Sequence, residues 1–256
     1  MPRIGLKLWS TNVGAYLHEA ERLHAEGTFD YLELFVVPDS LAMLPRWKAL
    51  KMPFVIHNAH AAQGFNLADP ECRERNREIY AQTKRFTDEL NARHIIFHGG
   101  IDGTADETIR QLLALNEPRA LLENKPFVPL PNPYGAKFCR GATKDEIGRI
   151  IAETGCGFCL DVGHAVCSAA SQGLEPYAFV GELNRLFRPT MYHLSDVLDM
   201  TSPYDAHPHL GHGVLDLAKL KREVFSPDAR ISIETEKSIP DGLADFQEDT
   251  RRLRHG

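Results

Sequence analysis

The sequence contains no long hydrophobic run, no basic leader and no regular pattern of cysteines. No 18 consecutive residues are apolar, and the N-terminal residues lack the basic and apolar regions of a secretion signal. We therefore expect neither a membrane span nor a cleaved signal peptide. The five cysteines are odd in number and irregularly spaced, which suits a reducing compartment. These absences predict a cytoplasmic protein with no membrane partner.

Concentrated positive charge is also missing. The formal net charge is −6 and no block of Lys and Arg stands out, which argues against general binding of nucleic acid. Cys156 and Cys159 form a lone C-x-x-C motif, whereas a structural zinc site usually needs a second pair. We interpret these two cysteines as small residues around a buried strand.

Eight short apolar runs recur along the chain, and no linker divides them. Near-continuous apolar character is typical of parallel strands buried on both faces. We expect strands at residues 4–8, 31–36, 54–57, 95–98, 120–123, 158–161, 191–194 and 231–234. Amphipathic stretches predict helices at residues 15–25, 70–90, 143–154, 215–225 and 241–253. The pattern predicts an α/β protein, a single (β/α)8 TIM barrel spanning residues 1–256.

A proline-rich loop, residues 125–140, follows the fifth predicted strand. It contains Pro126, Pro129, Pro131 and Pro133, which stiffen the chain. Loops at this end of a barrel strand surround the active site. The sequence leaves open whether the loop covers the site or contacts a partner chain, and it does not indicate an oligomeric state.

Residues that commonly bind metal ions stand at the carboxyl ends of six predicted strands. They are His57, His98, Glu123, Asp161, His193 and Glu234. Strand ends of a closed barrel converge on one cavity, so we expect these side chains to meet there. His164 lies one helical turn beyond Asp161, and Asp205 and His207 stand two residues apart in the loop after the seventh strand.

These nine residues exceed the about four to six ligands of a mononuclear site. We therefore predict two or three divalent ions with bridging carboxylates. Imidazole and carboxylate ligands without a thiolate suit zinc, manganese or iron, and the sequence does not choose among the three.

The order and spacing of the nine residues resemble endonuclease IV (AP endonuclease family 2), within the xylose isomerase-like TIM-barrel superfamily. The similar segments are Ile56-His57, Asn66-Leu67, Phe97-His98-Gly99-Gly100, Glu123-Asn124, Asp161-Val162-Gly163-His164-Ala165, His193-Leu194-Ser195-Asp196, the D-x-H-x-x-L-G-x-G string of residues 205–213, and Glu234-Thr235. The D-x-H string is the most specific of them. All nine positions carry the residue type that this family uses for three zinc ions.

The resemblance implies a role for each ligand. Glu123 would bridge two ions. The first of these would be completed by His57 and His98, the second by Asp161, His193 and Glu234, and a third ion would be held by His164, Asp205 and His207. An activated water would then attack a phosphoryl group whose charge the ions neutralise.

The parts with which that family holds DNA are reduced in this chain. Only about twenty residues, 37–54, connect the second and third predicted strands, where endonuclease IV has a longer DNA-gripping segment. Asn58, Ala59, His60 and Ala61 follow the first histidine in place of a bulky pair that wedges into the duplex. We therefore expect a small phosphorylated or sugar-like substrate, with DNA as a less favoured partner.

Several further residues are candidates for contact with this substrate. They are Trp9, Glu33, His60, Lys137, Arg140 and His209, while His212 joins Glu123 and Glu234 as a catalytic candidate. Lysine and arginine suit an anionic group, and histidine suits proton transfer. Four of these candidates also have a structural alternative: surface charge for the two basic residues, core packing for the tryptophan, and a buried ion pair for Glu33.

Four functions are compatible with these residues. The first is a multinuclear hydrolase of phosphoesters, which extends to a genuine abasic-site endonuclease. The second is a sugar or sugar-phosphate isomerase or epimerase, in which Glu123 and Glu234 flank one metal ion and exchange a proton beside a carbonyl. The third is an iron-dependent oxidase, and the fourth is a barrel that binds metal or ligand without turnover. The number of ions bound per chain separates the first two.

Overall fold

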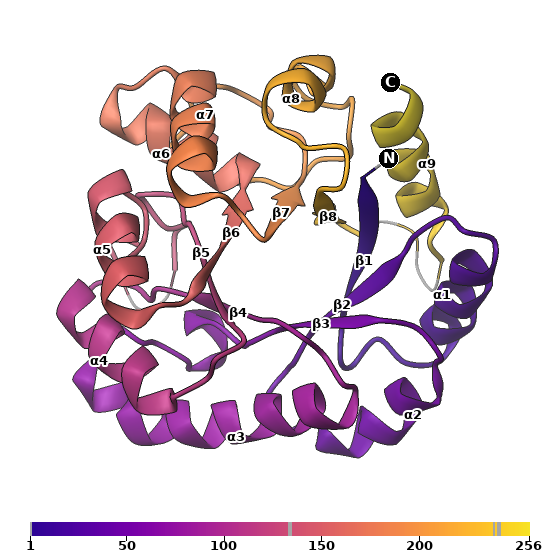
Figure 1. Cartoon of the computed structure of the whole chain (residues 1–256), viewed down its shortest axis with the longest axis horizontal. Coiled ribbons are helices and arrows are strands. Elements are labelled where there is room, and N and C mark those ends of the chain that lie inside the picture. The colour runs from indigo at the N-terminus through magenta and orange to yellow at the C-terminus, as the bar shows by residue number, and fades with distance from the viewer. Residues whose placement is uncertain (1, 133–134, 238, 240–241) are drawn as a thin grey trace.

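The computed structural model describes residues 2–132, 135–237, 239 and 242–256. Eight parallel strands pair in sequence order and close on themselves (Figure 1). They are β1 (Arg3–Trp9), β2 (Tyr31–Phe35), β3 (Phe54–His57), β4 (Ile95–His98), β5 (Ala120–Glu123), β6 (Gly157–Asp161), β7 (Met191–Leu194) and β8 (Arg230–Ile233). The predicted strands and the TIM-barrel fold are confirmed. The expected eighth strand included Glu234, whereas β8 ends at Ile233. Glu234 therefore follows the strand instead of ending it.

Helices surround this barrel. They are α1 (Ala15–Ala25), α2 (Leu44–Ala49), α3 (Arg73–Glu89), α4 (Ala105–Leu115), α5 (Lys144–Thr154), α6 (Val162–Gln172), α7 (Pro176–Phe187), α8 (Leu217–Glu223) and α9 (Ala244–His255), with short 3-10 turns η1 (Leu41–Met43), η2 (Ala61–Gln63) and η3 (Pro70–Cys72). The five predicted helices correspond to α1, α3, α5, α8 and α9. Asp241, where the last was expected to begin, and Pro133 lie outside the described residues.

The structure adds α2, α4, α6 and α7, which are not among the predicted helices. Helix α6 is buried along its first eight residues, so it shows no polar face that would reveal its period. Helix α4 did carry a signal. The Thr104 side chain accepts a hydrogen bond from the backbone N–H of Glu107, and a Thr followed three residues later by Glu is a helix-start pattern.

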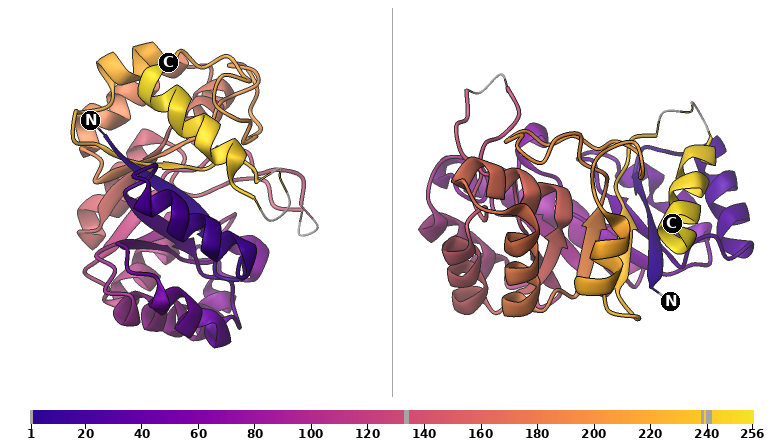
Figure 2. Two further views of the ribbon diagram at one scale, coloured as in Figure 1. Left: turned by 90° about the vertical axis from the view of Figure 1, so that its right-hand side faces the viewer. Right: turned by 90° about the horizontal axis from the view of Figure 1, so that it is seen from above.

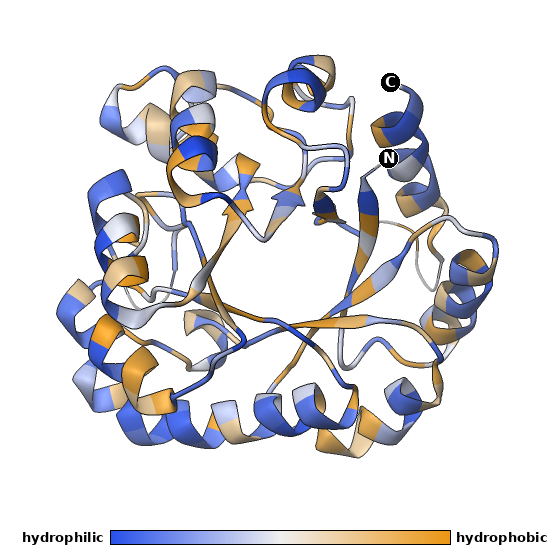
Figure 3. Ribbon diagram, viewed as in Figure 1, coloured by the Kyte–Doolittle hydropathy of each residue, from blue (hydrophilic) through white to orange (hydrophobic). Residues whose placement is uncertain are grey.

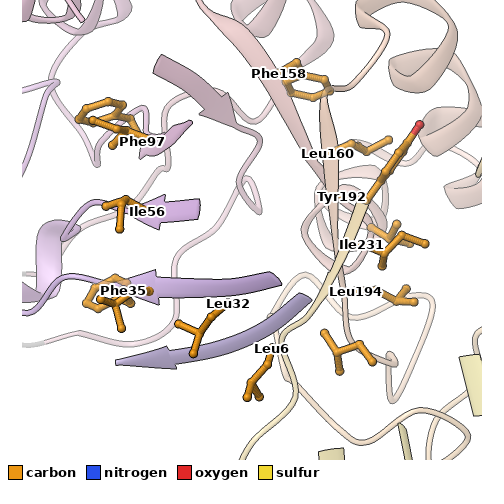
Figure 4. Close-up of a cluster of buried hydrophobic side chains, with 14 of the residues drawn as sticks. Leu6, Leu32, Phe35, Ile56, Phe97, Phe158, Leu160, Tyr192, Leu194 and Ile231 are labelled. Atoms are coloured by element: carbon orange, nitrogen blue, oxygen red, sulfur yellow. The ribbon is translucent and has the colours of Figure 1, made fainter. Parts of the chain in front are cut away.

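Side chains alternate between the two sides of each strand, because the period of a strand is two residues. Outward-facing residues pack against the helices, and Figure 4 shows Leu6, Leu32, Ile56, Leu160 and Ile231 among them. Figure 3 shows that most outer helices carry both hydrophobic and hydrophilic residues. A separate set of side chains therefore fills the interior of the barrel.

That interior is built in two layers. The lower layer is apolar and consists of Tyr31, Val55, Ile96, Leu121, Cys159 and Met191. Two positions further along the same strands stand Glu33, His57, His98, Glu123, Asp161 and His193. The upper layer is therefore polar, and the apolar layer closes the barrel beneath it. The interpretation of Cys159 as a buried small residue is confirmed, since its exposure is 0%.

The upper layer opens toward the carboxyl ends of the strands. Figure 2 shows that the segments following β5 and β7 rise on the same side of the barrel. The described parts of the proline-rich loop (residues 125–132 and 135–140) and the loop that carries Asp205 and His207 therefore lie at one opening. Within the described ranges, no helix combines the length and the hydrophobicity that a membrane crossing would require.

Candidate metal centre

The described residues form four groups of ligand-type side chains; one joins Glu33 to His57 and His193, and the other three consist of the nine predicted residues at the open end of the barrel. The first of these three consists of His57, His98 and Glu123, at the ends of β3, β4 and β5. Both histidines present Nε2 to the same carboxylate oxygen, Oε2 of Glu123, at 2.9 and 3.1 Å. The other nitrogen of His57 donates to the carbonyl oxygen of Asn58 at 2.7 Å, which leaves Nε2 with a free lone pair.

The second group contains Glu123, Asp161, His193 and Glu234. Nδ1 of His193 lies 2.7 Å from Glu234 Oε2, 3.5 Å from Glu123 Oε2 and 3.9 Å from Asp161 Oδ2. Glu123 belongs to both groups and is fully buried, so one carboxylate adjoins two clusters of ligand atoms. Within each group these atoms lie within 4.8 Å of one another.

The third group joins α6 to the loop after β7. Asp161 caps α6 by accepting the backbone N–H of His164 at 2.7 Å, and this places the His164 ring in the cavity. Oδ2 of Asp205 lies 3.1 Å from His164 Nε2 and 2.9 Å from His207 Nε2. The carboxylates of Asp161 and Asp205 outweigh the effect of burial and raise the pKa of His164 to about 10.

The D-x-H string of residues 205–213 is held in place by Asp196, which follows β7. Its carboxylate accepts backbone N–H groups from Gly211 at 2.7 Å and Leu215 at 3.0 Å. Gly211 has φ +80°, which disfavours any side chain, and a Cβ on Gly213 would lie 2.2 Å from the carbonyl oxygen of Val197. The two glycines of the string therefore let the loop wrap around Asp196.

The nine residues fit divalent ions. Among the described residues, the buried atoms Glu123 Oε1, His193 Nδ1 and Glu234 Oε2 make no hydrogen bond. Such atoms are costly to bury unless something compensates them, and a cation would do so. The donors are imidazole nitrogens and carboxylate oxygens without sulfur, which suits zinc, manganese or iron. The groups are consistent with a multinuclear metal site as in endonuclease IV.

A cavity of about 1000 Å³ lies above these groups. Three lysines that are not among the predicted site residues also line it: Lys7, Lys125 and Lys237. Lys7 forms ion pairs with Glu234 and Glu33, and Nζ of Lys125 lies 3.0 Å from His164 Nε2. Burial lowers the pKa of Lys237 to about 8.

One side of the cavity is apolar. Trp9 and Phe35 line it with ring centroids 5.5 Å apart, and the proline-rich loop contributes Pro126, Pro129, Leu130 and Pro131. That loop therefore faces the cavity. His60 also lines the wall, and burial together with the positive charge of Lys125 lowers its pKa to about 3. At neutral pH its ring is a neutral hydrogen-bonding group.

Five predicted residues lie elsewhere. Glu33 is fully buried among the strands, beneath the cavity wall. Nδ1 of His209 lies 2.8 Å from Asp249 Oδ2, on α9, and His212 is exposed. Lys137 is exposed, and the Arg140 guanidinium donates to the carbonyl oxygens of Asp102 and Gly103 and to Glu146. None of the five lines the cavity. For Arg140 and His209, local hydrogen bonds already use the polar groups that were expected to meet substrate.

Comparisons with known proteins agree with this geometry. The chain matches the family described as xylose isomerase-like TIM barrel over residues 25–255. A probable endonuclease 4 of Mycobacterium ulcerans (strain Agy99) is 30% identical over 215 residues, which cover 78% of this chain and 80% of that protein. A probable endonuclease 4 of Thermoplasma volcanium is 28% identical over 205 residues, covering 76% and 71%. The chain therefore belongs to the xylose isomerase-like TIM barrel family and is a distant homologue of the endonuclease IV proteins.

Solved structures show the same fold. The crystal structure of endonuclease IV from Thermus thermophilus superimposes with a TM-score of 0.72 at 22% identity and covers 100% of both chains. A D-tagatose 3-epimerase-like protein gives a TM-score of 0.66 at 19% identity over 98% of each chain. At these identities the likeness concerns the fold alone, and the residues of the site must separate the functions.

Proposed function

We propose that this protein is a multinuclear metal-dependent hydrolase that cleaves phosphate esters of small sugar-like or nucleotide-like molecules. The observation that carries the proposal is the third ligand group, formed by His164, Asp205 and His207. Additional ions neutralise charge on a phosphoryl group during its transfer to water. Exchange of a proton beside a carbonyl has no evident use for a third ion, so this group favours hydrolysis over isomerisation.

The charge of the site supports an anionic substrate. The three groups of predicted ligands contain four carboxylates, so three divalent ions would give a net charge of 6 − 4 = +2, and one ion would give 2 − 4 = −2. Lys7 and Glu33 lie 3.3 Å apart as an ion pair, so their two charges cancel in this sum. Lys125 and Lys237 add positive charge at the cavity wall. Only the multinuclear state therefore attracts a phosphate electrostatically.

The groups around the cavity have different roles in the proposed reaction. Bound divalent ions would supply an activated water and neutralise phosphoryl charge. Lys125 and Lys237 orient the anionic end of the substrate, since ammonium groups donate to phosphate oxygens. Trp9 and Phe35 contact its apolar or ring portion, and the proline-rich loop restricts access of bulk water from above.

A metal-dependent isomerase or epimerase is the second candidate. The second ligand group favours it, because Glu123 and Glu234 both adjoin Asp161 and His193 and would flank a single ion. The likeness to a D-tagatose 3-epimerase-like protein is compatible with this reading. It requires the third group to remain without a metal ion.

Abasic DNA is the substrate class that the resemblance to endonuclease IV suggests, and we place it behind small esters. The connection between β2 and β3 contains only η1 and the six-residue helix α2. Trp47 of α2 is fully buried and donates its Nε1–H to the carbonyl oxygen of Ser10 at 2.8 Å. This segment packs against the barrel, which leaves little of it available to grip a duplex.

The test combines metal counting with a substrate panel. Protein purified without added metal should contain two or three equivalents of zinc, manganese or iron by mass spectrometry. It should hydrolyse p-nitrophenyl phosphate, ribose 5-phosphate or a nucleoside monophosphate, and Glu123→Gln should abolish this activity and so exclude a contaminating phosphatase. One equivalent together with ketose epimerisation would establish the second candidate. Efficient nicking of abasic duplex DNA, without cleavage of small esters, would establish an endonuclease.

A further inference from the structure

Glu33 is a buried carboxylate that belongs to none of the three groups formed by the nine predicted ligands. It stands in the middle of β2 with an exposure of 0%. Its neighbours across the sheet are Lys7 on β1 and Val55 on β3, two residues before His57. A carboxylate at such a place is costly unless it is compensated, and its contacts therefore indicate what it does.

Both oxygens of Glu33 lie near polar groups of the barrel, although Oε1 makes no hydrogen bond. Oε2 accepts a hydrogen bond from the Ser232 hydroxyl at 2.5 Å and lies 3.0 Å from His193 Nε2. Oε1 lies 3.3 Å from the ammonium of Lys7. Through Oε2, Glu33 is therefore joined to His193 on the side of the ring that faces away from Glu234.

A role for Glu33 as a metal ligand is the first alternative. Its oxygen and one nitrogen each of His57 and His193 do lie within 4.8 Å of one another. A cation at that point, however, would adjoin the ammonium of Lys7 and would compete with the Ser232 hydroxyl. Because Lys7 already places a positive charge beside Glu33, the geometry argues against a fourth ion at this point.

We infer that Glu33 is a positioning residue that fixes the tautomer of His193 and thereby directs Nδ1 at the second metal ion. A neutral imidazole carries one N–H, and a buried carboxylate beside Nε2 holds that proton there. The lone pair then stays on Nδ1, the atom that lies 2.7 to 3.9 Å from carboxylate oxygens of Glu234, Glu123 and Asp161. This inference rests on the proposed binding of metal ions.

His57 shows the same arrangement with a weaker acceptor. Its Nδ1 donates to the carbonyl oxygen of Asn58 at 2.7 Å. This ring therefore presents Nε2 to the site, whereas His193 presents Nδ1. A charged acceptor raises the basicity of the ligand nitrogen more than a carbonyl does. Glu33 should therefore strengthen the binding of the second metal ion more than the binding of the others.

The test uses Glu33→Gln, which keeps the shape and removes the charge. Zinc affinity is measured by competition with a chromophoric chelator, and stoichiometry by mass spectrometry. We expect one of the bound zinc ions to dissociate about 10- to 100-fold more readily, with the others unchanged. Glu107→Gln is the matched control. Glu107 is also buried, at 2% exposure, but it pairs with Arg73 outside the site, so this variant should lose stability and keep every zinc affinity.

A second measurement needs no variant and covers the case in which Glu33→Gln fails to fold. Nitrogen-15 NMR of the histidine rings in the zinc-loaded protein should show a proton on Nε2 of His193 and none on Nδ1. The opposite tautomer, or an unchanged set of zinc affinities in Glu33→Gln, would overturn the inference while leaving the proposed hydrolase intact. If the unaltered protein binds no zinc, manganese or iron, the proposed function and this inference fail together.

Discussion

Asp205 and His207 lie on one loop with Oδ2 and Nε2 2.9 Å apart, and the same oxygen lies 3.1 Å from His164 on α6. Two residues of a loop thus complete a cluster whose third member belongs to a helix of the barrel. The positions of Asp205 and His207 depend on Asp196 and on the two glycines that wrap around it. This arrangement has a direct consequence for the number of ions bound.

We predict that the double variant Asp205→Ala/His207→Ala loses about one equivalent of metal and at least about 100-fold in phosphoesterase kcat, because an ion that neutralises phosphoryl charge is missing. His212→Ala is the control from the same loop, since His212 is exposed and lies away from the cavity. It should keep both metal content and kcat. Unchanged stoichiometry in the double variant would remove the third site, and a loss of kcat in His212→Ala would restore that residue as a catalytic candidate.

The ligand layer could be predicted from the sequence because it follows from two regular features. Strands have a period of two residues, and all strands of a parallel barrel end on one face. His57, His98, Glu123, Asp161 and His193 therefore converge whatever the loops do. The same period identifies Lys7, which stands between Leu6 and Leu8 and faces inward beside Glu33. Its signal is easily missed, because the run around it reads as uniformly apolar.

The loops could not be predicted in this way. Lys125 and Arg140 both belong to the proline-rich loop, yet only Lys125 reaches the cavity. The outcome depends on a turn at Asp102 and Gly103, whose carbonyl oxygens accept from Arg140 across about 37 residues of sequence. Long-range hydrogen bonds of this kind follow from the assembled fold and leave no periodic trace in the sequence. Whether a lysine or arginine of this loop reaches the cavity is therefore visible only in the structure.

This placement predicts that Arg140→Met destabilises the protein without affecting substrate binding. Loss of the hydrogen bonds to two carbonyl oxygens and to Glu146 should lower the free energy of unfolding by about 1–2 kcal/mol. Urea denaturation measures this change, and KM for a phosphoester should stay within about twofold. Lys137→Met is the matched variant, exposed and in the same loop, and should change stability by less than about 0.5 kcal/mol. A several-fold rise in KM for Arg140→Met at unchanged stability would contradict the structural role.

The two tryptophans of the chain provide a probe of the apolar wall. Trp9 is 50% exposed and lines the cavity, whereas Trp47 is fully buried. An aromatic substrate that stacks on Trp9 should gain about 1 kcal/mol. We therefore expect Trp9→Ala to raise KM for p-nitrophenyl phosphate about fivefold and to leave KM for glycerol phosphate unchanged.

Trp9→Phe should retain the preference, because it keeps an aromatic ring at the wall. Fluorescence gives an independent reading. A non-hydrolysed aromatic phosphonate should quench the emission of the unaltered protein and should not quench that of Trp9→Phe, in which only the buried Trp47 remains. Equal quenching in both proteins would place the aromatic group elsewhere.

The lowered pKa of Lys237 predicts that activity declines at mildly alkaline pH. Its pKa is lowered to about 8 by burial at the cavity wall. The protonated form is the charged one, so the ammonium is present below about pH 8 and is lost above it. For an anionic ester, kcat/KM should therefore fall as the pH rises through about 8.

Lys237→Arg separates this cause from the titration of any other group. The guanidinium stays charged to about pH 12, so the fall should move to higher pH while activity at about pH 7 is largely kept. Lys237→Gln should lower kcat/KM about tenfold at about pH 7 and make it insensitive between about pH 7 and 9. An identical alkaline limb in all three proteins would assign the decline to another group and would remove Lys237 from the binding of the anion.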